Sequence, residues 1–129
     1  SHVLPALIIK FLEAKYNGSS SVEIWGTGNV RREFLFVEDL ADALYFLMQN
    51  YADKSFINVG VGSDITIKQL ANEVCKLTGF GGKIKFDVTK PDGMPRKLLD
   101  TSRLKAYGWR PKVTLEEGLK RTIDWYKNL

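Results

Sequence analysis

The chain has 129 residues, 44% of them hydrophobic and 26% charged, so it is long and apolar enough to fold around one core. Its net charge of +4 favours anionic partners, but both signs are interspersed and no basic run suits a nucleic acid, so we expect a small anionic ligand. The single cysteine excludes an intrachain disulfide and a cysteine-rich metal site and is typical of the reducing cytoplasm, and no apolar run approaches the roughly 20 residues that span a membrane.

The first predicted element is a helix from Pro5 to about Tyr16, since proline suits a first helical turn and Asn17-Gly18 a helix end. Apolar residues form one stripe along it, and Ile9 widens the stripe, so we expect the helix to pack on more than one side. An apolar helix at this place suggests that further residues precede it. A short strand from Val22 to Trp25 follows.

The residues after this strand combine a tight turn with two adjacent guanidiniums. Gly26 and Gly28 can take positive φ, which lets the backbone reverse and leaves little bulk above it. Arg31 and Arg32 point to opposite faces of an extended segment, so one can enter a cleft, where its fork and the nearby ring of Trp25 suit a nucleotide diphosphate. The alternative is a core tryptophan and a solvated arginine pair. The turn is no dinucleotide fingerprint, because Arg31 replaces the third glycine.

A brief extended apolar run, Phe34 to Val37, leads into a predicted helix from Asp39 to Asn50. Glu38 and Asp39 put negative charge at the positive end of this helix. Apolar residues lie on most of its surface, so we expect it to be mostly buried. Phe56 to Gly60 follows as a short apolar strand, of the kind found in a parallel sheet that is covered on both faces.

Capping signals mark the two helices of the second half of the chain. Thr66 to Gln69 predicts a capping box that opens a helix ending at Thr78, and Thr114 to Glu117 predicts a second one before a helix from Leu115 to Lys127. The elements expected between these helices are an alternating strand at 83–88, a loop at 89–97 with prolines and cations, and a short helix at 102–107.

Several short motifs occur along the chain: Ser1-His2-Val3-Leu4-Pro5, Trp25-Gly26-Thr27-Gly28, Arg32-Glu33-Phe34, Asn58-Val59-Gly60 and Lys90-Pro91-Asp92-Gly93-Met94-Pro95-Arg96-Lys97-Leu98-Leu99-Asp100. In their order and spacings they resemble the C-terminal part of the GDP-L-fucose synthase family. The resemblance covers essentially the whole chain. It implies an α/β fold, namely the substrate-binding C-terminal part of an extended short-chain dehydrogenase/reductase, with elements that would complete a missing Rossmann sheet.

The resemblance implies a reaction for the complete enzyme. Members of the family epimerise GDP-4-keto-6-deoxy-D-mannose at the two carbons beside the ketone and then reduce the ketone with NADPH, which gives GDP-L-fucose. His2 matches the acid of the epimerisation and a contact to NADP(H). An acid with an intrinsic pKa near 6.5 suits the labile protons beside a ketone. On composition alone, a histidine near a chain end such as His2 is more often an ordinary exposed residue, or a cloning remnant.

The resemblance also implies a set of substrate contacts. Lys10 matches a basic substrate contact, and Trp25 and Arg32 match residues that hold the GDP moiety. Asp92 matches a contact to the guanosine part, and Lys97 a contact to the phosphates. Without the resemblance, the two lysines are ordinary surface residues and Asp92 is a turn former.

The departure from the family is that the N-terminal half is missing. A complete member has a glycine-rich dinucleotide-binding half, a Ser/Tyr/Lys reduction set and a cysteine base, and Cys75 matches none of these motifs. We therefore expect residues 1–129 to be a substrate-binding fragment without the NADP-binding Rossmann domain, inactive alone. Elements that pack on that domain, the helix after Asp39 and the strand at 56–60, would leave apolar faces exposed, so we expect self-association of the fragment and a homodimer for the full-length enzyme.

Two alternatives stay open. The chain could be the substrate domain of another nucleotide-sugar epimerase or dehydratase, because many of these enzymes share the motif that begins at Arg32. It could also be a non-catalytic interaction module that touches nucleic acid, although its basic residues are scattered and lack the interleaved aromatics that stack on bases. We expect a GDP-sugar as the ligand and neither nucleic acid nor a membrane as a partner.

Overall fold

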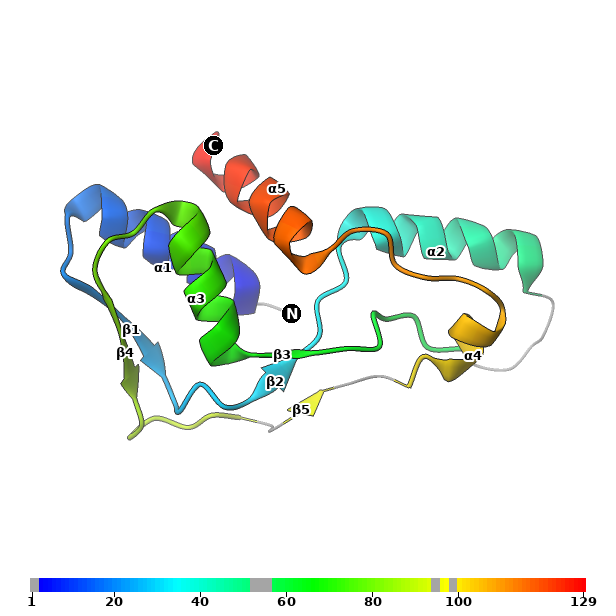
Figure 1. The fold of residues 1–129 in the computed structure, drawn as a ribbon, viewed down its shortest axis with the longest axis horizontal. Coiled ribbons are helices and arrows are strands. Elements are labelled where there is room, and N and C mark those ends of the chain that lie inside the picture. The colour runs from blue at the N-terminus through cyan, green and yellow to red at the C-terminus, as the bar shows by residue number, and fades with distance from the viewer. Residues whose placement is uncertain (1–2, 52–56, 94–95, 98–99) are drawn as a thin grey trace.

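The computed structural model describes residues 3–51, 57–93, 96–97 and 100–129. The elements in chain order are α1 (Val3–Asn17), β1 (Ser21–Trp25), β2 (Arg31–Arg32), α2 (Val37–Asn50), β3 (Ile65–Thr66), α3 (Ile67–Thr78), β4 (Lys83–Asp87), β5 (Arg96–Lys97), α4 (Ser102–Ala106) and α5 (Leu115–Lys127). Figure 1 shows α1, α3, β1 and β4 at one end of the long axis and α2 and α4 at the other. The short strands β2, β3 and β5 lie between the two groups.

The main core lies where α1, α3 and α5 pack against the β1–β4 pair. β1 and β4 run parallel in the register Ser21↔Lys83 to Trp25↔Asp87. The residues at its centre are Ile8, Phe11, Leu70, Val74, Leu119 and Ile123, all of them almost completely buried. The apolar stripe expected on the first helix therefore faces this core. The helix contacts β1, α3 and α5, so it packs on more than one side as expected, although Ile9 itself is 41% exposed.

The predicted caps of α3 and α5 are confirmed, whereas α1 begins at Val3 and α2 at Val37, each two residues earlier than predicted. The Thr66 hydroxyl accepts from Gln69 N at 3.1 Å, the Gln69 side chain accepts from Thr66 N at 3.1 Å, and Gly79 closes α3 in the left-handed conformation. At α5, Thr114 accepts from Glu117 N at 3.2 Å. The first turn of α3 lies beside the Gly26–Gly28 turn, since Lys68 N donates to Gly28 O at 2.9 Å.

A small sheet of three short strands lies between the two groups of elements. β2 pairs antiparallel with β3 and parallel with β5, so Arg31 lies opposite Thr66 and Arg32 lies opposite Lys97. The expected loop at 89–97 is therefore wrong at its end, where β5 adds a third strand. A two-residue strand carries no periodicity, and only the neighbouring Arg31–Arg32 strand makes it form.

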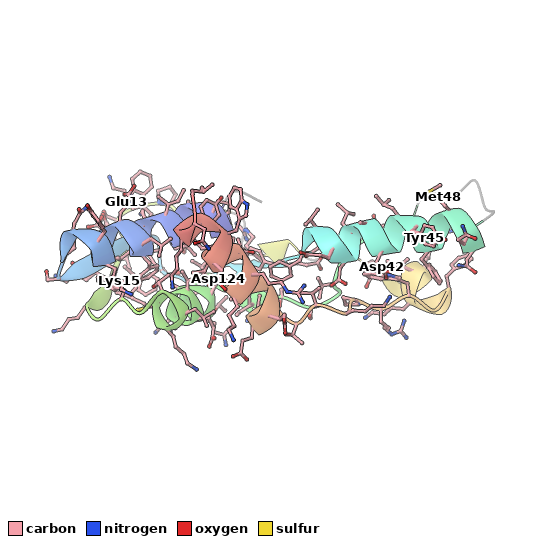
Figure 2. The ribbon with its side chains drawn as sticks, turned by 90° about the horizontal axis from the view of Figure 1, so that it is seen from above. Glu13, Lys15, Asp42, Tyr45, Met48 and Asp124 are labelled. Atoms are coloured by element: carbon pink, nitrogen blue, oxygen red, sulfur yellow. The ribbon has the colours of Figure 1, made fainter. Side chains whose placement is uncertain are left out.

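The other group of elements packs around Ala43, Leu104 and Trp109. The expectation that α2 is mostly buried is wrong: Met48 is 83% exposed and Leu44 is 51% exposed. Figure 2 shows Tyr45 and Met48 on α2, away from α1, α3 and α5. Asp39 and Ala43 are the buried residues of the helix, while Val37, Tyr45 and Met48 are mostly exposed. The exposed apolar face expected for a fragment is thus present.

The strand expected at 56–60 is not found in its described part. Phe56 lies outside the described residues, and residues 57–60 form no strand. A parallel strand needs a neighbour on at least one edge, and no described strand lies beside this segment. The Asn58 side chain instead donates to Asp100 O at 3.1 Å.

A buried carboxylate ties α2 to the segment before α5. Asp39 is almost fully buried, and its carboxylate accepts from Lys112 N at 2.9 Å and from Val113 N at 3.0 Å. The sequence predicted only a favourable charge at a helix start, whereas the structure uses this side chain as a tertiary contact. In the described part of the chain, no helix has the length and apolarity to cross a bilayer.

Candidate functional site

A hollow of about 350 Å³ opens between the first half of α1, the end of β1, β2 and the start of α3. The residues that line it are Val3, Ala6, Leu7, Lys10, Ile24, Trp25, Gly28, Val30, Arg32, Ile67 and Asp92. Of the predicted site residues, Lys10, Trp25, Arg32 and Asp92 are in this set. Four side chains from distant parts of the sequence therefore surround one space, with apolar walls and polar groups at its edge.

Trp25 stands at the end of β1 with 60% of its surface exposed, so the alternative of a core tryptophan is wrong. Strand pairing puts Trp25 opposite Asp87, and the turn after Asp87 brings Lys90 to the indole. The Lys90 ammonium lies 5.3 Å from the ring centroid, within cation–π range. An exposed aromatic ring beside a cation is a surface on which a planar, anionic ligand can bind.

The two adjacent arginines have different surroundings, as the extended backbone predicts. Arg31 Nε donates to Asp64 Oδ1 at 2.9 Å, and the Asp64 side chain is only 3% exposed. Arg32 instead lines the hollow, and its Nη1 donates to Arg31 O at 2.7 Å. The interpretation of a solvated pair is therefore wrong. Arg31 forms a partly buried ion pair, and Arg32 lines the hollow.

Asp92 is held at the rim of the hollow by Thr27. Its Oδ1 accepts from Thr27 N at 2.7 Å and its Oδ2 accepts from the Thr27 hydroxyl at 2.8 Å. The hydrogen bond from the Thr27 hydroxyl is the largest cause that holds the pKa of the Asp92 carboxyl below its usual value, and the bond from Thr27 N is the next. A hydrogen bond from Gly28 N lowers this pKa further. The carboxylate therefore stays ionised to a lower pH than an ordinary aspartate.

Lys10 comes from the middle of α1 and reaches across to β1. Its Nζ donates to Glu23 O at 2.9 Å, which orients the ammonium along the strand that ends in Trp25. The backbone of Lys97 lies beside Arg32 through the β2–β5 pairing. The Lys97 side chain and His2 lie outside the described part of the structure, although Val3, next to His2, lines the hollow.

The sequence analysis missed Thr27, Asp64 and Lys90 as neighbours of the site. Thr27 had a detectable signal, because a hydroxyl between two glycines can hydrogen-bond across a turn. Lys90 could have been found by pairing the two parallel strands. Asp64 had no local signal, because its contact with Arg31 depends on the β2–β3 pairing.

Two further features are the single cysteine, Cys75, and the lack of a metal-binding group among the described residues. Cys75 is partly buried on α3, its Sγ lies 3.5 Å from Phe80 O, and burial raises the pKa of its thiol. A thiol with a raised pKa stays protonated to a higher pH than an ordinary cysteine, so less of it is in the thiolate form. No group of His, Cys, Asp and Glu within the described ranges could hold a metal ion.

Comparison with known proteins gives consistent matches. Residues 1–60 match the NAD dependent epimerase/dehydratase family. The chain is 54% identical over 126 residues to GDP-L-fucose synthase 1 of Arabidopsis thaliana. The matched segment makes up 98% of this chain and 39% of that protein. The chain thus spans about two fifths of the length of the curated relatives it matches.

Solved structures show the same fold. A GDP-mannoheptose C4 reductase from Campylobacter jejuni with NADP bound has a TM-score of 0.87 at 40% identity and matches 97% of this chain and 44% of that one. A GDP-L-fucose synthetase from Naegleria fowleri has a TM-score of 0.92 at 28% identity, over 99% and 40% of the two chains. The expected fold class is confirmed, and so is the resemblance to the C-terminal part of GDP-L-fucose synthases, which nearly the whole chain matches.

Proposed function

We propose that this chain is the GDP-sugar-binding part of a GDP-L-fucose synthase. The complete enzyme would epimerise GDP-4-keto-6-deoxy-D-mannose at C3 and C5 and reduce C4 with NADPH. The observation that carries the proposal is that Lys10, Trp25, Arg32 and Asp92 surround one hollow in a chain that resembles this family. Surface residues that share no ligand would not be expected to line one hollow together.

The chemistry of each side chain supports a nucleoside diphosphate as the ligand. The planar fork of Arg32 matches phosphate oxygens, and Lys97, whose backbone pairs with Arg32, would add a second cation for the phosphates. The exposed ring of Trp25 offers a stacking surface, and the Asp92 carboxylate an acceptor for N–H groups of guanine. Lys10 would meet the remaining part of the anion.

His2 would act as the acid of the epimerisation and contact the nicotinamide cofactor. This proposal is supported by its position before Val3, a residue that lines the hollow. NADP(H) would be held mainly by an N-terminal Rossmann domain that is not in this sequence. In the described residues, the Gly26-x-Gly28 turn leads into β2 and not into a helix, so it does not offer a helix N-terminus to a pyrophosphate.

Residues 1–129 would then be a substrate-binding fragment of a cytoplasmic enzyme that is a homodimer at full length. Alone, the chain would expose the apolar face of α2 formed by Val37, Leu40, Leu44, Tyr45 and Met48. We propose that a second copy of the chain covers this face in solution, because these five apolar side chains are between 39% and 83% exposed.

A calorimetric titration of the chain with GDP and with UDP tests the proposed ligand. We expect GDP to bind at least about tenfold more tightly than UDP, since uracil offers fewer N–H donors to Asp92. Tighter binding of UDP would assign the chain to another nucleotide-sugar epimerase or dehydratase. Strongly salt-dependent binding to any polyanion, unchanged in a Trp25→Ala variant, would instead support the interaction module.

An activity assay tests the fragment proposal separately. Incubation of the chain with NADPH and GDP-4-keto-6-deoxy-D-mannose should yield no GDP-L-fucose, because the reduction set is not in this sequence. Turnover by the chain alone would contradict the assignment of catalysis to a second domain. The GDP titration does not depend on this result, so the two proposals can fail independently.

A further inference from the structure

Thr27 connects the glycine turn to the rim of the hollow through two hydrogen bonds. Its N–H and its hydroxyl donate to the two oxygens of Asp92, at 2.7 and 2.8 Å, across 65 residues of sequence. Each carboxylate oxygen thus receives its own donor, which fixes the plane of the carboxylate as well as its distance. We call this pair of bonds the Thr27–Asp92 clasp.

The backbone on either side of Thr27 lies very close to neighbouring side chains. Gly26 has φ +90°, and a Cβ at this position would overlap Asp92 Oδ1. Gly28 has φ +79°, and a Cβ there would lie 2.6 Å from the ring of Phe86. Glycine is therefore required at both positions by backbone conformation and by space. The turn lies directly against the end of β4 and the Asp92 side chain.

The other side of the turn is held as well. The Thr27 hydroxyl accepts from Asn29 N at 3.1 Å while it donates to Asp92. Gly28 O accepts from Lys68 N, and Val30 O accepts from Ile67 N, both at 2.9 Å. The turn, which begins after Trp25, is thus hydrogen-bonded to the start of α3 on one side and to Asp92 on the other.

We propose that Thr27 is a positioning residue for the nucleotide: through the clasp it sets Asp92 and Trp25 at a fixed separation before the ligand binds. This inference rests on the proposed function. An ionised carboxylate has about four lone-pair sites, so Asp92 keeps acceptor capacity toward the hollow while Thr27 occupies one site on each oxygen. A carboxylate of fixed orientation favours a base with two adjacent N–H donors, such as guanine, over a base with one.

The test compares Thr27→Val, which removes the hydroxyl and keeps the shape and the backbone N–H, with Thr27→Ser, which restores a hydroxyl. Thr122→Val is the matched control, because the Thr122 hydroxyl donates to Gly118 O at 2.7 Å within α5, away from the hollow. Three properties are measured for each: the GDP affinity by calorimetry, the pKa of Asp92 by carboxyl ¹³C NMR, and the folded fraction by circular dichroism.

We expect Thr27→Val to weaken GDP binding about tenfold and to raise the pKa of Asp92, since a hydrogen bond to the charged form is lost. Thr27→Ser should stay near the parent chain in both, and Thr122→Val should change neither. An unchanged pKa in Thr27→Val would mean that the clasp does not form. An unchanged GDP affinity with a raised pKa would mean that Asp92 needs no positioning.

The pKa measurement needs no ligand, so it separates the clasp from the proposed function. If the parent chain binds no GDP, the proposed function and the positioning role both fail, and the pKa of Asp92 in Thr27→Val still decides whether the clasp exists. A loss of GDP affinity in Thr27→Ser as large as in Thr27→Val would also overturn the proposal, because the serine hydroxyl can make the same bond.

Discussion

Arg31 and Asp64 form an ion pair at 2.9 Å in which the carboxylate is almost completely buried, while Arg32, the next residue, faces the hollow. The alternation of an extended backbone separates the two guanidiniums. One forms an ion pair beside the β2–β3 pairing, and the other lines the hollow in which we propose that the ligand binds. Two identical residues side by side therefore have different roles.

Substitution of each arginine by glutamine tests this division. Arg31→Gln should lower the free energy of unfolding by about 1–3 kcal/mol, because the buried Asp64 carboxylate loses a charged donor, with little change in GDP affinity. Arg32→Gln should weaken GDP binding at least about tenfold and change stability less. Urea denaturation and calorimetry measure the two effects. The same pattern of losses in both variants would contradict the assignment.

Gly26→Ala should destabilise the chain more than Gly18→Ala. Both glycines have positive φ, which costs an alanine about 1–2 kcal/mol, but a Cβ at Gly18 meets nothing within 4 Å. At Gly26 it would overlap Asp92, so a total loss of about 2–4 kcal/mol is expected, together with weaker GDP binding. Urea midpoints give the comparison. Equal losses at the two positions would show that Asp92 moves away freely.

Leu44→Lys should reduce self-association of the chain. Leu44 is half exposed in the apolar face of α2, and a charge there would have to be desolvated at a contact between two copies. Tyr16→Lys is the control, because Tyr16 is 90% exposed at the end of α1. Sedimentation velocity over a range of concentrations measures the effect. A monomeric parent chain, or an equal effect of both variants, would contradict a contact through α2.

Stability should fall in acid. The pKa values of Asp42, Asp92 and Asp100 are lowered from 3.8, chiefly by hydrogen bonds from Lys112, Thr27 and Ser102 respectively. A carboxyl with a lowered folded pKa contributes its stabilisation above about pH 4 and loses it as the pH falls through 3.8 toward the folded value. Urea midpoints at pH 7, 5 and 3 should drop mainly in the last step. Asp92→Asn should flatten that drop, and a midpoint independent of pH would oppose the account.

Local signals in the sequence were sufficient for most of the helices. Thr66, Gln69 and Gly79 mark the two ends of α3 by short-range hydrogen bonding, and the structure reproduces that assignment. The described part of the strand expected at 56–60 and the burial of α2 were predicted wrongly for another reason. Both depend on what lies beside these segments, and the described chain has no element there.

The candidate site shows the same division between local and long-range information. Trp25 and Arg32 were chosen from motifs, and no periodicity could show that they face one hollow with Lys10 and Asp92. The β5 strand and the clasp of Thr27 with Asp92 arise from pairing across long stretches of chain. Such contacts follow from tertiary packing and cannot be predicted from residue spacing.

The central claim is that Lys10, Trp25, Arg32 and Asp92 bind one nucleotide together. A titration of the ¹⁵N-labelled chain with GDP, followed by ¹H–¹⁵N NMR, tests it most directly. The account predicts that the amides of these four residues and the indole N–H of Trp25 shift together along one binding curve, while the indole signals of Trp109 and Trp125 stay in place.

Trp125 is the internal control, because it is as exposed as Trp25 but lies on α5. A larger open hollow of about 640 Å³ beside Lys15, Lys83 and Lys85 offers GDP a competing basic surface. Shifts confined to residues around the 350 Å³ hollow would support the account. Shifts centred on those three lysines, or no shift at Trp25 at saturating GDP, would contradict it.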